Sequence, residues 1–292
     1  MLGQQLGVSR VTIHKHIAAL KNEGYSIEVG RHGYVLQESG LPRLASWEFP
    51  PEENIRVLKV VDSTMNEAMA LADRHPGEEC IVVAERQTLG RGLGNQDWHS
   101  PEGGLWASRV LYPHRSSAEV QRMVLAASVA LVHVLEKDWN LQAKISWPND
   151  VMVDGRKIAG LMADALIRGD RIARLVMGMG IHVNNNHSDM FLALKDAVGK
   201  EADRRSLLLR WREETDSILS SDPPPAGDSS PTWCHGKILG IGEERSLHCS
   251  KTLYTGYHRG IDGLGRLLLE IAPGKILGFS PGDLDEYTRS RV

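Results

Sequence analysis

The sequence predicts an α+β chain built from a small N-terminal winged helix-turn-helix, a central mixed α/β domain and a C-terminal β-barrel. Three observations lead to this prediction. The first 22 residues contain basic but no acidic side chains, strand and helix patterns alternate through the middle, and short strands broken by glycine fill the end. The length of 292 residues also exceeds the usual size of a single domain.

The composition is that of a globular protein outside membranes. Hydrophobic residues make up 41% of the chain and charged residues 24%, and no apolar run reaches the roughly 20 residues of a membrane span. The net charge of −3 argues against a surface that coats nucleic acid throughout. The first ten residues show no secretory signal. We therefore expect a cytoplasmic protein that does not bind membranes.

The cysteines support a reducing compartment. Three cysteines without a CxxC pair fit free thiols better than a disulfide framework. The mirrored pairs Cys234-His235 and His248-Cys249 do not predict a zinc site, because neighbours on a strand point to opposite faces. We therefore assign no set of metal ligands from the sequence.

The N-terminal segment has the pattern of a helix-turn-helix with a wing. Residues 6–9 form the expected turn, and Ser9 is placed to cap a helix from Arg10 to Asn22. One apolar stripe recurs along this helix at spacings of four and three, formed by Ile13, Ile17 and Leu20. Two strand-like segments, 26–29 and 34–36, follow as a hairpin wing.

Polar residues beside this stripe predict a surface that reads DNA. A recognition helix presents such groups to the phosphates and base edges of an operator. The residues concerned are Ser9, Arg10, Thr12, Lys15 and His16. A small structural helix and hairpin without DNA contact fits the periodicity equally well.

The middle and end of the chain supply the other two domains. Strand-like runs cover Val57–Val61, Ile81–Ala84, Leu105–Leu111, Ile145–Trp147, Ile158–Leu166 and Leu175–Met179. Helical patterns cover Thr64–Arg74, Ala118–Asp138 and Arg204–Leu219. Segments 42–54 and 220–231 have the composition of linkers, and the short strands beyond residue 237 predict a small β-barrel. The predicted domains are therefore residues 1–40, 55–220 and 232–292.

A glycine-rich loop gives the densest chemical signal. It spans residues 85–98 and follows the strand Ile81–Ala84. Its glycines let the backbone approach an anion, and Arg91 supplies a fixed charge with paired donors. The loop is neither a Walker A loop nor a GxGxxG motif. By itself it fits a flexible surface loop as well as an anion site.

A second polar cluster begins at Trp147 and ends at Gly160. Asn149 and Asp150 follow a strand, where their oxygens can orient a ligand or hold Mg²⁺. Lys157 begins the next apolar run, where its ammonium can face a phosphate. A plain hairpin turn with a solvated lysine is the alternative.

Two further segments add small and hydroxyl-bearing residues. Residues 178–184 place two glycines in an apolar run, which permits close approach of the backbone. Residues 62–68 place Ser63 and Thr64 where a strand gives way to a helix. For either hydroxyl alone, capping of the helix is the favoured role.

The order and spacing of these four segments resemble the biotin protein ligase family. The shared patterns are ST near the start, QTxGRG followed by a tryptophan, WPNDV with a following lysine, and GxG ahead of VN. The front end resembles the winged helix of the bifunctional biotin operon repressor, and residues 259–270 resemble that family's SH3-like C-terminal domain. The resemblance covers nearly the whole chain and implies a class II synthetase-like central domain.

The resemblance implies a biotin–[biotin carboxyl-carrier protein] ligase that works in two steps. The carboxylate of biotin attacks the α-phosphorus of MgATP, which gives biotinyl-5′-AMP and pyrophosphate. A lysine of a biotin carboxyl carrier protein then attacks the mixed anhydride and releases AMP. The resemblance also implies a homodimer and biotin-dependent repression at operator DNA, with ATP, Mg²⁺ and biotin as the small molecules involved.

The resemblance implies a role for individual residues of each motif. The ring system of biotin would contact Ser63, Thr64 and Gln87. The loop over the acyl phosphate would be Gly90, Arg91 and Gly92. Lys157 would bridge carboxylate and phosphate and Gly160 would leave room for the ligand, with Asn149 and Asp150 on the phosphate and metal side. The predicted catalytic residues are Arg91, Lys157 and Asp150, and the strand with Leu105 and Trp106 would help to wall the slot.

Four features depart from the family pattern. Leu93 stands where a second arginine is usual, Ser146 replaces a basic residue, and His182 replaces an asparagine. The first two changes remove positive charge, so we expect weaker retention of the adenylate. The chain also begins close to the turn, so the first helix of a winged domain is expected to be missing.

Two other functions are compatible with the same residues. One is a transcription regulator that senses a ligand without ligating it, which the missing arginine at Leu93 favours. The other is a lipoate-type protein ligase, which shares the catalytic fold. The winged helix and the GRG loop favour biotin over lipoate.

Overall fold

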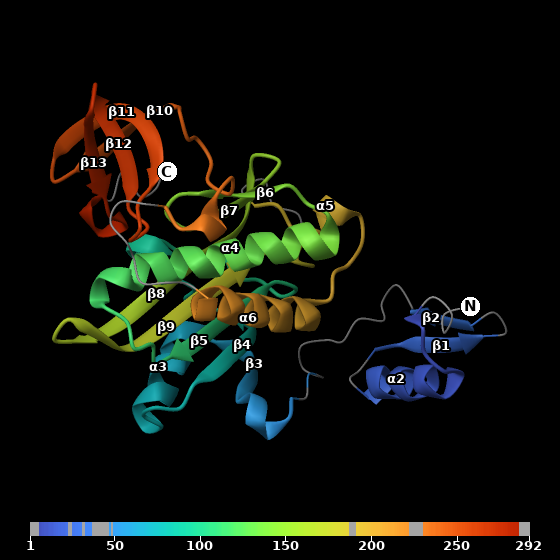
Figure 1. Cartoon of the computed structure of the whole chain (residues 1–292). Helices are drawn as coiled ribbons and strands as arrows, with labels where there is room; N and C mark the ends of the chain where they lie inside the picture. Colours follow the sequence, from blue (N-terminus) through green and yellow to red (C-terminus); the bar gives the residue numbers. More distant parts are fainter. Residues whose placement is uncertain are drawn as a thin grey trace.

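In the computed structural model, three β-sheets organise the described residues, which are 6–22, 25–30, 33–36, 47, 49–186, 191–221 and 230–285. A seven-stranded sheet lies at the centre of the molecule. A two-stranded sheet belongs to the N-terminal module and a four-stranded sheet to the C-terminal module, and these two modules lie at opposite ends (Figure 1).

The central sheet has the order β3-β4-β5-β9-β8-β7-β6. Its strands are β3 (Ile55–Val61), β4 (Cys80–Gln87), β5 (Leu105–Leu111), β6 (Ala143–Ser146), β7 (Asp150–Val153), β8 (Arg156–Arg168) and β9 (Arg171–Ile181). The β3–β4 pair is parallel and the other pairs are antiparallel. The predicted mixed α/β domain is therefore built mostly on antiparallel pairing.

Helices cover both faces of this sheet. Helix α3 (Thr64–Arg74) packs on one face, and α4 (Val120–Trp139) and α6 (Arg204–Ser221) pack together on the other; α5 (Leu194–Val198) is short. The two-residue period of β4 separates the cores, because Val82 joins the α3 side while Ile81 and Val83 join the α4 side. The site described below lies on the α3 side.

Helix α4 is the centre of the larger core. The helical stretch 117–139 is long and apolar enough to cross a membrane, but 78% of its apolar window is buried inside the protein. All its residues from Met123 to Val132 are buried. Among the described residues, this stretch therefore acts as a core helix between the sheet and α6.

The N-terminal module consists of α2 (Arg10–Asn22) and the antiparallel hairpin β1 (Ile27–Gly30) and β2 (Gly33–Leu36). The Ser9 hydroxyl accepts a hydrogen bond from the Thr12 N–H at 3.1 Å, so the predicted N-cap and helix bounds are confirmed. Ile13 is buried, and the other two stripe residues are half-buried. The expectation that the first helix is missing concerns the start of the chain, where residues 1–5 lie outside the described residues. Residues 42–46 and 48 of the first linker and 222–229 of the second also lie outside them.

The C-terminal module is a four-stranded antiparallel sheet. Its strands are β10 (Glu244–Cys249), β11 (Thr252–Ile261), β12 (Leu267–Ala272) and β13 (Lys275–Phe279), paired in sequence order. Closure of this sheet into a barrel stays a prediction. Short 3₁₀ turns lie at Pro51–Glu53, Leu93–Asn95, Ser117–Glu119, Thr232–Cys234 and Pro281–Asp283. All three cysteines are free thiols.

Two elements of the central domain were not predicted, β7 and α5. Strand β7 is four residues long and exists because it pairs on both sides, with β6 and with β8. Strands β8 and β9 also run beyond their predicted apolar parts, because they pair with each other in a long hairpin turned at Gly169. In each case the pairing partner, which local sequence does not report, decides where the strand ends.

Candidate functional site

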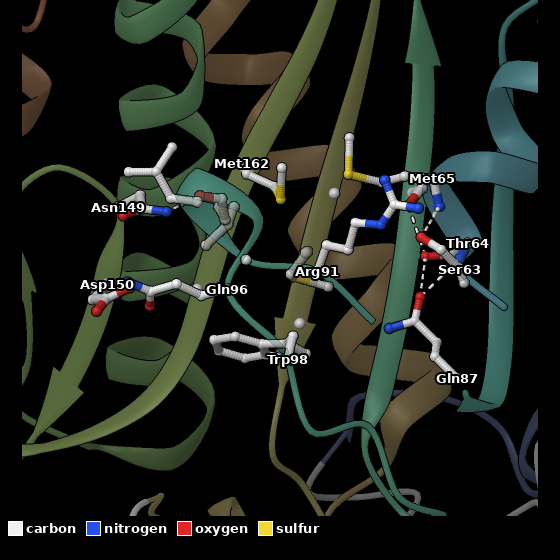
Figure 2. A pocket seen from close by; sticks show the side chains of 18 of the residues that line it. Ser63, Thr64, Met65, Gln87, Arg91, Gln96, Trp98, Asn149, Asp150 and Met162 are labelled. Atoms are coloured by element: carbon white, nitrogen blue, oxygen red, sulfur yellow. Dashed lines mark hydrogen bonds between the residues drawn. The ribbon is translucent and has the colours of Figure 1, made fainter. Parts of the chain in front are cut away.

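A cavity of about 300 Å³ opens on the α3 side of the central sheet. Segments from all four sequence motifs line it, although they are far apart along the chain. The predicted residues that line it are Ser63, Thr64, Gln87, Arg91, Gly92, Asn149, Asp150, Lys157 and Gly160. Figure 2 shows the hydroxyl-bearing residues on one side of this pocket and Asn149 with Asp150 on the other.

Hydroxyl and amide groups form the polar side of the pocket. The Thr64 hydroxyl donates to Gln87 Oε1 at 3.0 Å and lies 2.8 Å from the Ser108 hydroxyl (Figure 2). The Thr64 N–H donates to the same Gln87 oxygen at 2.7 Å. Gln87 Nε2 donates to the Ser100 hydroxyl at 2.8 Å, which fixes the amide orientation. Ser63 accepts from the Met65 N–H at 3.2 Å and thereby caps α3.

The glycine-rich loop folds back over the pocket. The Trp98 N–H donates to the Gly90 carbonyl at 2.9 Å, and the Gly92 N–H donates to the Gln96 carbonyl at 2.7 Å. A Cβ on Gly90 would lie 2.5 Å from the Trp98 carbonyl oxygen. Gly90 is thus needed for the close packing of the loop. Gly90 was predicted to contact the ligand, but it is not among the residues that line the pocket.

Arg91 extends from this loop across the pocket toward Thr64 and Met65 (Figure 2). Hydrogen bonds from the Asn66 amide and the Ser63 N–H lower the pKa of the Asp62 carboxyl, and the Arg91 guanidinium lowers it further. The exposed Arg91 guanidinium therefore lies near an ionised carboxylate at the polar side.

An ion pair marks the opposite side. Lys157 Nζ lies 2.7 Å from Asp150 Oδ1, and both side chains are largely buried. Burial raises the pKa of the Asp150 carboxyl, and the Lys157 ammonium offsets part of that rise. The same ammonium lies 4.8 Å from the centre of the Trp98 ring. This edge can hold a phosphate or carboxylate close to a fixed positive charge.

Two glycines on neighbouring strands make room for Trp98. Gly160 on β8 and Gly180 on β9 are register partners, and the indole lies across both. A Cβ on Gly180 would lie 2.4 Å from Trp98 Nε1, and one on Gly160 would lie 3.1 Å from the ring. The two glycines therefore permit a flat aromatic group on the floor of the pocket.

His182 lies beneath this floor. Its ring stacks on Phe191 with centroids 4.4 Å apart, and Asn185 Nδ2 lies 2.8 Å from its Nδ1 atom. The ring is 1% exposed, and Nε2 has no hydrogen-bond partner. Burial lowers the pKa of His182 to about 4, and nearby His99 and Lys157 act in the same direction. The imidazole is therefore neutral at pH 7.

Sequence reasoning missed some lining residues and misplaced others. Ser108, which completes the hydroxyl cluster, is a lone hydroxyl in an apolar strand, and that contrast was the available signal. Phe191 comes from a loop without any local signal. The expected wall residues Leu105 and Trp106 do not line the pocket; Ala107 and Ser108 of the same strand do.

The residues predicted to contact DNA lie in the separate N-terminal module (Figure 1). Arg10, Lys15 and His16 are exposed on α2, whereas Ser9 and Thr12 also bond to each other through their hydroxyls at 2.8 Å. The structure thus brings the pocket residues together and leaves the α2 residues on a distant surface.

Comparison with known proteins matches the central domain and the N-terminal module to two known families. The chain matches the biotin/lipoate A/B protein ligase family over residues 57–182 and an HTH domain over residues 1–35. The bifunctional ligase/repressor BirA of Bacillus subtilis is 31% identical over 292 residues, which covers 94% of this chain and 89% of the relative. BirA of Bacillus spizizenii has the same identity and coverage. The chain belongs to the biotin protein ligase family.

A solved structure of this family supports the fold assignment. The biotin protein ligase from Aquifex aeolicus, in complex with biotin and ATP, superposes with a TM-score of 0.64 at 26% identity. The match covers 80% of this chain and 98% of that chain. Two of the positions that depart from the family pattern lie at or beneath the pocket of this family member, because Leu93 lines it and His182 supports its floor.

The buried His182 predicts a pH dependence of stability. Because its pKa is lower in the folded state, the unfolded chain binds more protons between about pH 6.5 and pH 4, so the free energy of unfolding falls as the pH falls. We expect urea unfolding to show that, as the pH falls over this interval, the free energy of unfolding of His182→Asn decreases by about 2–3 kcal/mol less than that of the parent. Parallel pH curves for the two proteins would contradict this assignment.

Proposed function

We propose that this chain activates biotin with ATP and transfers it to a lysine of a biotin carboxyl carrier protein. The observation that carries the proposal is the arrangement of the pocket. A neutral hydroxyl and amide cluster lies on one side, a buried lysine–carboxylate pair lies on the other, and an exposed arginine lies between them. Such a pocket suits a ligand with a polar neutral ring at one end and a carboxylate at the other.

In the first step, the ring would be held by Ser63, Thr64 and Gln87. A cyclic urea offers two N–H donors and one carbonyl acceptor, which match the hydroxyl and amide groups of this cluster. Binding there requires Arg91 to move, because its side chain extends toward Thr64 (Figure 2). Displaced Arg91 would then be available to face the acyl phosphate.

The reacting atoms would meet at the Lys157 edge. A carboxylate oxygen of biotin attacks the α-phosphorus of ATP, the new P–O bond forms, and pyrophosphate leaves with the electron pair of the broken bond. Lys157 would hold the carboxylate and the phosphoryl oxygens together, and Trp98 would shield them from water. Gly160, whose missing Cβ makes room for the Trp98 ring, would also leave space for the acyl chain beside that ring.

In the second step, the free ε-amine of the carrier lysine attacks the anhydride carbonyl and a C–N amide bond forms. AMP leaves with the electron pair of the broken C–O bond, and the nitrogen releases one proton to solvent. Asp150 is the side chain suited to Mg²⁺ on the triphosphate, because Mg²⁺ takes one or two carboxylates together with phosphate oxygens. The ion would supply neutralisation of phosphate charge. Asn149 orients this edge through its hydrogen bond to the Leu161 carbonyl.

We also propose how the parts of the chain divide this work. Residues 1–40 form a DNA-binding module, residues 55–220 the catalytic domain, and residues 232–292 a C-terminal domain whose four-stranded sheet closes as an SH3-like barrel. The protein acts in the cytoplasm, where its free thiols are stable, and as a homodimer.

Ligation is tested by incubating the protein with MgATP, a carrier domain and either labelled biotin or labelled lipoate. We expect label from biotin on the acceptor lysine, and a loss of about 10³-fold in rate for Lys157→Ala, because a preorganised cation at the reacting phosphate is removed. Lys59→Ala, an exposed lysine on β3, is the control. Label from lipoate alone, or no label at all, would refute the proposal.

Retention of the adenylate tests the departure at Leu93, which lines the pocket. We expect Leu93→Arg to release biotinyl-AMP about five- to tenfold more slowly than the parent, because a charge-assisted hydrogen bond to phosphate is gained. Leu93→Met keeps the side chain neutral and should behave as the parent. Equal release rates for the arginine and methionine variants would argue against the expected role.

A second function, repression, is favoured by the exposed basic residues of α2 and by the HTH match. We expect gel shifts with biotin-operon DNA in the presence of biotin and ATP, weakening steeply with salt. Lys15→Ala should reduce the salt slope by about one, because one phosphate contact is lost, whereas Lys200→Ala in the central domain should not. Binding that is absent or insensitive to salt would exclude this function.

A further inference from the structure

One of the contacts between the C-terminal module and the central domain is a tight turn, residues 262–266. The Asp262 carboxylate is 1% exposed and holds this turn together. Its Oδ1 atom accepts from the N–H groups of Leu264 and Arg266, both at 2.9 Å, and its Oδ2 atom accepts from Arg266 Nε at 2.6 Å. A carboxylate with these partners fixes the directions of the intervening carbonyl groups.

Two carbonyls of the turn point into the central domain. The Gly265 carbonyl accepts a hydrogen bond from Trp147 Nε1 at 2.9 Å, and the Gly263 carbonyl accepts from the Arg122 guanidinium on α4. The turn also packs closely against α4, because a Cβ on Gly265 would lie 3.2 Å from the main-chain nitrogen of Arg122. Trp147 is fully buried, so its N–H has no access to water as an alternative partner.

Trp147 is only three residues before Asp150, whose carboxylate forms the phosphate edge of the pocket. The residues between them are held on other sides as well. The Pro148 carbonyl accepts from Gln121 Nε2 at 3.1 Å, and the Asn149 carbonyl accepts from the Leu161 N–H at 3.1 Å. The position of the Asp150–Lys157 pair therefore depends on a short segment whose first anchor lies in the C-terminal module.

We propose that Asp262 and Trp147 are positioning residues for the ligation reaction, which couple the C-terminal module to the phosphate edge of the pocket. Neither residue touches the pocket space, and both act through Asn149 and Asp150. The proposal rests on the proposed ligase activity for its kinetic test. It predicts that substitutions in the turn weaken the use of ATP and leave the binding of the biotin ring nearly unchanged.

The kinetic test uses the full chain and measures biotin-dependent exchange of pyrophosphate into ATP. We expect Trp147→Phe and Asp262→Ala each to lower kcat/KM for ATP about tenfold while KM for biotin changes less than twofold. Asp262→Asn keeps an oxygen acceptor for the two N–H groups and should restore most of the loss. The double variant should lose less than the product of the single losses, because both act through one contact.

Matched controls separate positioning from general damage to the fold. Trp211 is also fully buried, and its Nε1 donates to the Ala127 carbonyl at 3.0 Å, on the other side of α4 from the pocket. Trp211→Phe therefore removes the same kind of hydrogen bond without reaching the pocket. Asp283→Asn alters a different turn of the C-terminal module, where Asp283 accepts from the Ser280 N–H at 2.8 Å. If these controls match the test variants in KM and kcat, the proposal is overturned.

A measurement without substrates distinguishes failure of this proposal from failure of the proposed function. We expect hydrogen–deuterium exchange of the amides at residues 149–153 to accelerate about tenfold in Asp262→Ala and not in Asp283→Asn. A parent protein that forms no adenylate but shows this exchange pattern would refute the ligase function and support the coupling. Unchanged exchange in Asp262→Ala would refute the coupling whatever the activity.

Discussion

The register that sets Gly160 opposite Gly180 is the constraint on which the pocket depends. Asp150 on β7 is the next register partner of Gly160, so the Asp150 edge and the floor of the pocket lie in one row across three strands. A slip of one residue would turn this row to the opposite face and place the Ile181 side chain toward the pocket. The space for Trp98, and with it the position of Lys157 over the indole, would then be lost.

Two cations of the site differ in burial, because Lys157 is largely buried in an ion pair whereas Arg91 is exposed. Lys157 keeps a carboxylate partner, which makes its burial tolerable, and Trp98 covers the pair. His182 has no ion-pair partner of this kind; burial lowers its pKa to about 4, so the imidazole stays neutral within its aromatic surroundings. Arg91 comes from a loop and is exposed at the pocket. The floor is thus neutral, and the positive charge lies where phosphate would bind.

Local signals explain what could be predicted from the sequence. Helices α2 and α3 and strand β5 have the predicted bounds, because a capping serine begins each helix and a mostly apolar run defines the strand. Three of the four motifs gave nine predicted pocket residues, because the residues of each motif are contiguous in the sequence. Strand β7 and Phe191 could not be found, because their places depend on pairing partners and on a loop, and neither is encoded in a local pattern. Gly90 belongs to a motif that is recognisable in the sequence, but its contact with the Trp98 carbonyl depends on how the loop folds back, which the motif does not report.

The two outer modules join the central domain at different places. The C-terminal module joins the central domain beside the Asp150 edge, both through Trp147 and through main-chain pairing of Ile145 with the segment at Ile238. The N-terminal module approaches the start of α6, where Tyr25 bonds to Asp203 next to the buried Arg204–Glu85 pair. Glu85 lies on β4 two residues before Gln87, but neither Glu85 nor Arg204 lines the pocket. The two outer modules therefore contact the central domain at different places, one beside the Asp150 edge of the pocket and one at the start of α6.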